Sequence, residues 1–99
     1  MPPSDSSEPL DDVADFLKDE LTKLKAGAKA DIQTFAGDLS TELMRASAAG
    51  DEGAVEEVQA QARALAGVNK VRLNEAQWSG FDFAIALGVK LATAALSAA

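Results

Sequence analysis

The sequence predicts an all-α protein with one domain, folded as an elongated helical hairpin or as a three-helix bundle. Two long segments place apolar residues at helical spacing, and a third segment is apolar and rich in alanine. The length of 99 residues is enough for one core. An apolar content of 47% and a mean hydropathy of −0.02 indicate a folded chain rather than a disordered one.

The chain begins with residues of the kind found in disordered segments. Residues 1–8 are mostly proline, serine and acids, so we expect a disordered acidic arm there, followed by a single helical domain over 9–99. The start carries neither a basic stretch nor an apolar stretch of the kind found in secretory signals. We therefore expect a cytoplasmic protein, or one within a virion assembled in the cytoplasm.

The first helix is predicted over 9–49. Its apolar positions share one face for about ten turns, and they are Leu10, Val13, Leu17, Leu21, Leu24, Ala28, Ile32, Phe35, Leu39, Leu43 and Ala46. Gly50 and Gly53 end this pattern. Gly27 and Gly37 each weaken a helix by about 1 kcal/mol. Neither interrupts the apolar face, so we predict one continuous helix that can bend at either glycine.

The second helix is predicted over 52–76, with Asp51 as its N-cap and glutamates in its first turns. Gly67 interrupts the apolar face, and Val68 and Val71 fall outside it. The segment after Gly67 therefore either changes register or presents a second contact face.

The third helix is predicted over 80–98. Large residues alternate there as in a strand, namely Phe81, Phe83, Ile85, Leu87, Val89 and Leu91. A helix is favoured because alanine is abundant and because the polar residues share one narrow face, namely Asp82, Lys90, Thr93 and Ser97. Ser79 and Asp82 have the spacing of a capping box at its start.

This third helix is also the predicted interface. One neighbouring helix cannot cover its wide apolar face, so we expect it to be buried against other chains, in a homo-oligomer or a larger complex. Small residues at a spacing of four (Ala84, Gly88 and Ala92) allow another helix to approach closely. The predicted interface residues are Trp78, Phe81, Phe83, Ile85, Leu87, Gly88, Leu91 and Leu96.

Trp78, the one tryptophan, lies at the predicted junction of the second and third helices. One interpretation is an interface anchor, because tryptophan is enriched among residues that dominate binding energy. The other is a side chain that fixes the angle between the two helices. The two roles are compatible.

The composition excludes most catalytic chemistry. The chain has no Cys, His or Tyr, so we expect no enzyme, no cofactor and no zinc site. The acids at the start of the first helix lack the spacing of a calcium loop, and they complement the helix dipole instead.

Nucleic acid is an unfavourable partner for this chain. The net charge is −7, so the protein repels a phosphate backbone. Lys18, Lys25 and Lys29 share one flank of the first helix, but no aromatic residue is interleaved to stack on bases. We expect these lysines to pair with acids of the same helix or of a neighbouring one.

The sequence thus predicts a non-enzymatic structural or adaptor subunit whose apolar C-terminal helix docks into a multi-chain assembly. In its shortness, its alanine content and its lack of cysteine, the chain resembles small structural or accessory proteins of bacteriophage particles, which implies a virion component. The alternative is a peripheral or tail-anchored membrane protein that uses the same helix. Lys90 argues against a membrane span, because a lysine at mid-span costs roughly 2.5–3.5 kcal/mol.

Overall fold

The computed structural model describes residues 8–50 and 52–98, and this part of the chain contains four helices and no strand. The helices are α1 (Glu8–Leu24), α2 (Lys29–Ala49), α3 (Ala54–Val68) and α4 (Glu75–Ala98). The predicted all-α class is confirmed, and the helix count differs because the expected first helix is divided into α1 and α2. The predicted acidic arm, apart from Glu8, lies outside the described residues, and so does the expected N-cap Asp51.

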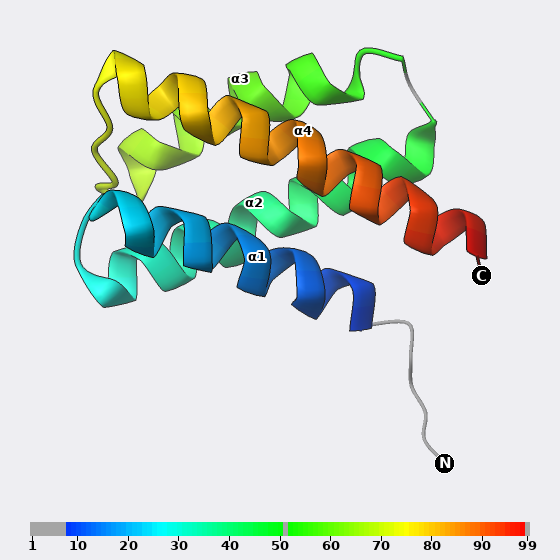
Figure 1. Ribbon diagram of the computed structural model, residues 1–99, viewed down its shortest axis with the longest axis horizontal. Helices are drawn as coiled ribbons and strands as arrows, with labels where there is room; N and C mark the ends of the chain where they lie inside the picture. Colours follow the sequence, from blue (N-terminus) through cyan, green and yellow to red (C-terminus); the bar gives the residue numbers. More distant parts are fainter. Residues whose placement is uncertain (1–7, 51, 99) are drawn as a thin grey trace.

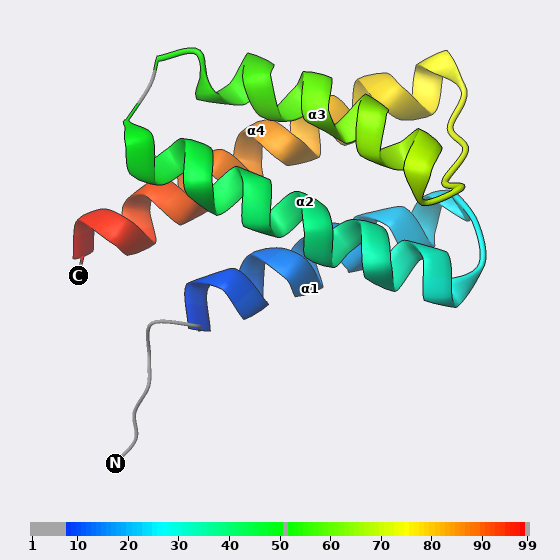
Figure 2. The same cartoon turned by 180° about the vertical axis from the view of Figure 1, so that it is seen from behind.

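The helices form two layers. α1 and α4 lie side by side in front in Figure 1, and α2 and α3 form the layer behind them, which Figure 2 shows from its own side. α4 packs against all three other helices. The radius of gyration is 13.0 Å and the longest extent is 39 Å. A single helix of forty residues would be about 60 Å long, so the division of the first helix is what makes the bundle short.

The division occurs at Lys25, which has a left-handed φ of 52°. The amide of Lys25 donates to the carbonyl of Thr22 at 3.1 Å, and the amide of Ala26 donates to the carbonyl of Leu21 at 3.4 Å. These are the two hydrogen bonds of a Schellman motif, and the buried pair of Leu21 and Ala26 supplies its apolar contact. The expectation of one helix over 9–49 was wrong because a lysine, rather than Gly27 or Gly37, takes the left-handed position.

α3 ends in the same way, at a left-handed Lys70 with φ 60°. The amide of Lys70 donates to the carbonyl of Gly67 at 3.4 Å, and the amide of Val71 donates to the carbonyl of Ala66 at 2.9 Å. The second helix therefore stops at Val68 instead of continuing to residue 76. The loop after α1 and the loop after α3 contact each other, because the amide of Arg72 donates to the carbonyl of Ala26 at 2.9 Å.

α4 begins five residues earlier than the sequence predicted. A capping box forms between Asn74 and Gln77, in which each backbone amide donates to the side-chain oxygen of the other residue, at 2.9 and 2.8 Å. Ser79 therefore lies inside the helix instead of capping it. The Gln77 amide nitrogen also donates to the carbonyl of Leu24 at 3.1 Å, which fixes the start of α4 to the end of α1.

All four helices contribute buried side chains to one core, and α4 crosses α2 within it. The rings of Phe35 and Phe81 have their centroids 6.0 Å apart. The backbone at Gly88 approaches so closely that a Cβ built there would lie 2.9 Å from Cδ1 of Leu43. The predicted ridge of Ala84, Gly88 and Ala92 is buried. It does allow a close helix approach, and the helix that approaches is α2 of the same chain.

Candidate interaction surface on the last helix

An apolar row remains exposed on α4. Phe83, Leu87 and Leu91 are 68%, 38% and 54% exposed. Their spacing of four places them in one row along the helix, which is called the α4 stripe below. Exposed large apolar side chains that are scattered singly are ordinary, whereas a contiguous row is typical of a binding surface.

The other predicted interface residues have different places. Phe81 and Ile85 are 1% and 0% exposed, and Gly88 is also buried. All three lie in the core of the chain itself, because α4 has three helical neighbours instead of the single one assumed from the sequence. Leu96 is 38% exposed, as Leu87 is, but it lies near the end of α4 and on the side of the helix opposite the stripe.

Trp78 lies half-buried on the side of α4 that faces α3. Its ring packs at 6.0 Å from that of Phe81, and the Arg63 guanidinium of α3 lies over it at 4.8 Å from the ring centroid. Arg63 also makes two hydrogen bonds to the Asp82 carboxylate, at 3.2 and 2.9 Å, and these raise the pKa of Arg63 above its usual value. These contacts connect α3 to α4.

The two edges of the α4 stripe carry opposite charges. On the α1 side, Asp12, Val13, Leu91 and Ala95 line a hollow of about 130 Å³. On the other side, Lys90 is exposed one residue before Leu91, about 60° around the helix from Leu87. Within residues 8–50 and 52–98, neither Asp12 nor Lys90 has an ion pair.

Sequence reasoning placed Asp12 in an acidic cluster and Leu91 in an interface, but it could not bring them together. Their proximity depends on α1 packing beside α4, which follows from the break at Lys25. No residue order marks that break in the sequence, because a lysine followed by alanine also occurs at Lys29 and Ala30, which lie inside α2.

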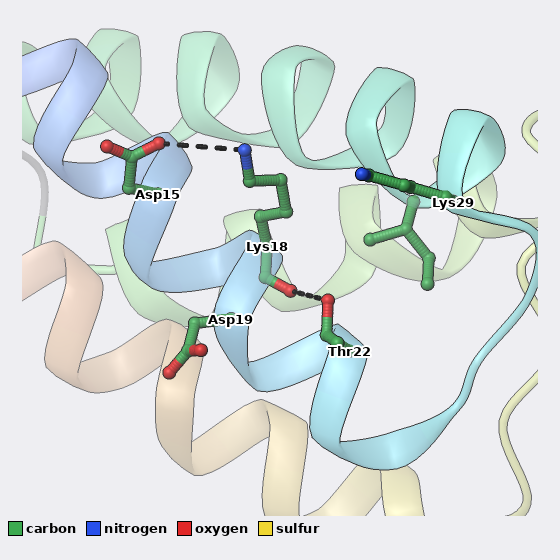
Figure 3. A pocket seen from close by; sticks show the side chains of 6 residues that line it. Asp15, Lys18, Asp19, Thr22 and Lys29 are labelled. Carbon is green, nitrogen blue, oxygen red and sulfur yellow. Dashed lines mark hydrogen bonds and ion pairs between the residues drawn. The ribbon is translucent and has the colours of Figure 1, made fainter.

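A second hollow, of about 330 Å³, lies between α1 and α2 (Figure 3). Lys18 extends from α1 toward Asp15, with 3.9 Å between Nζ and Oδ1, while Lys29 reaches in from the start of α2. Thr22 turns its hydroxyl back onto the Lys18 carbonyl at 2.8 Å. Lys18 thus pairs within its own helix, as expected, whereas Lys25 and Lys29 have no ion pair within residues 8–50 and 52–98.

In the part of the chain that the structure describes, no group of three or more acidic, histidine or cysteine side chains is placed to hold a metal ion. One helix there, α4, is long and apolar enough to cross a membrane by length and composition, with a mean hydropathy of 1.4 over its most apolar window. The core helix of a water-soluble bundle passes the same test, and a third of that window is buried inside the chain.

Comparison of the chain with protein-family models, with curated proteins and with solved structures finds no match in any of the three. Geometry, burial and charge are therefore the basis for the function proposed below.

Proposed function

We propose that this protein is a non-enzymatic structural or adaptor subunit that docks onto another protein chain through the α4 stripe. The observation that supports this is the exposed row of Phe83, Leu87 and Leu91 on a helix whose other large apolar side chains, apart from Leu96, are covered by the chain itself. The proposed setting is a multi-chain assembly in the cytoplasm, and a virion formed there is one such assembly.

The size of the stripe sets a condition on the partner. Full burial of a large apolar side chain contributes about 1.5–3 kcal/mol. Scaled by the exposed fractions of its three side chains, the stripe offers roughly 2–5 kcal/mol. Association costs about 4–15 kcal/mol in lost freedom of motion. A partner that binds must therefore bring apolar surface of its own and also contact the charged edges of the stripe.

The apolar composition of α4 also favours a second candidate function, contact with a membrane. Two observations make it the weaker candidate. A span would remove Phe81 and Ile85 from the core that α4 shares with three helices, and giving up that packing opposes insertion. Surface binding would bring a chain of net charge −7 against anionic lipid, which repels it.

Photo-crosslinking in living cells tests the proposal. The crosslinking amino acid benzoylphenylalanine replaces Phe83, and a matched control carries it at Gln61, an exposed residue of α3. A discrete protein adduct at position 83 and its absence at position 61 would support docking through the stripe. Lipid adducts would move the membrane candidate ahead, and equal labelling at both positions would contradict any specific surface on α4.

A further inference from the structure

We propose that the occupant of the α4 stripe is a second copy of this chain, with the two α4 helices roughly parallel about a two-fold axis and Asp12 of each copy paired with Lys90 of the other. This inference rests on the proposed function and specifies its partner. It is carried by the opposite charges at the two edges of the stripe.

The position of Asp12 is the first observation. The acids Asp15, Asp19 and Glu20 of α1 each pair with a lysine of the same helix. Asp12 has no ion pair within the described residues and lines the hollow beside Leu91. It therefore places an uncompensated negative charge on the α1 side of the stripe, level with residues 91–95 of α4.

Lys90 supplies the complementary charge. It is exposed, it too lacks an ion pair in the described ranges, and it lies on the edge of the stripe away from α1. Because it precedes Leu91 by one residue, it lies at nearly the same height along α4 as Asp12. The stripe is thus bordered at one height by a negative charge on one side and a positive charge on the other.

Symmetry decides which arrangement of two copies uses these charges. A two-fold axis that lies in the interface and is perpendicular to α4 makes the two α4 helices antiparallel. It places the α1 helices of both copies at the same edge of the interface, so that the two acidic helices face each other. An axis along α4 carries α1 of each copy to the Lys90 edge of the other. Only this second arrangement pairs Asp12 with Lys90, and it does so twice because the interface is the same patch on both copies.

The apolar contacts of this arrangement are self-matching. Phe83, Leu87 and Leu91 of one copy meet the same residues of the other, with Leu87 at the centre. Rows with a spacing of four interdigitate when helices cross at about −50°, so the axis follows the bisector of two inclined helices. The chain's charge of −7 opposes this association at long range, and physiological salt screens charges separated by more than about 8 Å.

The test measures the dimer dissociation constant of the purified full-length chain by sedimentation equilibrium and light scattering, from about 1 μM to 1 mM. Four variants are compared with the native chain: Phe83→Asp, Asp12→Lys, Lys90→Asp and the double charge reversal. Asp15→Lys is the matched control, because Asp15 is an acid of the same helix that lines the hollow toward α2. Circular dichroism confirms that each variant keeps its helices.

The expected result is a concentration-dependent dimer that Phe83→Asp abolishes. Each single reversal raises the dissociation constant about tenfold, because it turns two attractive pairs into two repulsive ones. The double reversal restores the constant to within about twofold of the native value, and Asp15→Lys leaves it unchanged.

Other results overturn the inference at distinct points. If Phe83→Asp abolishes the dimer but the charge reversals leave its dissociation constant unchanged, the parallel pairing is refuted and docking through the stripe is still supported. A chain that stays monomeric to 1 mM refutes the second copy as occupant. In that case the crosslinking at position 83 decides the proposed function separately: an adduct with a different protein preserves it, and the absence of any protein adduct refutes it too.

Discussion

The close approach of α2 and α4 predicts opposite effects for the same substitution at two glycines of one helix. Gly80 and Gly88 both lie inside α4. A Cβ added at Gly80 would meet nothing within 4 Å, whereas one added at Gly88 would lie 2.9 Å from Cδ1 of Leu43. Leu43 is fully buried, so its side chain has little room to turn away.

The magnitudes follow from two terms. Replacing a glycine inside a helix by alanine stabilises the fold by up to about 1 kcal/mol through helix propensity. Forcing a methyl group into a packed core costs about 1–3 kcal/mol. Gly80→Ala should therefore stabilise by up to about 1 kcal/mol, and Gly88→Ala should destabilise by roughly 0–2 kcal/mol, since both terms apply there.

Urea denaturation, monitored by circular dichroism, measures both changes in the free energy of unfolding. Thermal unfolding provides a second readout, because a change of 1 kcal/mol shifts Tm by about 4–8 °C in a domain of this size. A double-mutant cycle isolates the steric term. In a Leu43→Ala background the obstructing methyl group is gone, so Gly88→Ala should change sign and stabilise the fold by about 1 kcal/mol. If Gly88→Ala stabilises the native chain as much as Gly80→Ala does, the close packing of α2 on α4 is wrong.

Three further predictions concern the features that define the bundle. Lys70→Gly should raise the free energy of unfolding by about 0.5–1 kcal/mol in urea titrations, because glycine adopts a left-handed φ without the strain that lysine bears there; a loss of stability would contradict this helix ending. Asn74→Ala should lower it by about 0.5–2 kcal/mol through loss of the capping box, and equal stability would place the start of α4 elsewhere. Phe81→Ala should cost about 3–5 kcal/mol whereas Phe83→Ala should cost no more than about 1 kcal/mol, and similar costs at both positions would refute the division of α4 into a core face and an exposed stripe.

The helical class and the main buried faces could be predicted from the sequence because the 3.6-residue period of apolar residues continues from α1 into α2, although the helix itself ends between them. Leu17, Leu21, Ile32 and Phe35 all lie in the core as the single-helix pattern implied. The pattern continues because α2 folds back on α1 and both helices turn their apolar faces to α4. A period alone cannot distinguish one long helix from two that share a core.

The helix ends were mispredicted because their signals are weak or misleading in a single sequence. Lysine is an unusual residue for a left-handed helix ending, where glycine is the common choice. Ser79 and Asp82 matched a capping box as well as Asn74 and Gln77 did. Tertiary contacts separate the two candidates, since Gln77 also bonds the carbonyl of Leu24 and Asp82 is engaged by Arg63.

The break at Lys25 also determines how much of α4 is left for a partner. With one long first helix, about three quarters of the last helix would need cover, and one neighbouring helix could not provide it. With α1 and α2 separate, the fold places α1 beside α4 and both α2 and α3 in the layer beneath it, so that Phe81, Ile85 and Gly88 become core (Figure 1). What remains is a narrow apolar row with Asp12 on one edge and Lys90 on the other. A row of this size offers little affinity by itself, so the proposed docking relies for its selectivity on Asp12 and Lys90, neither of which belongs to the apolar pattern that first indicated an interface.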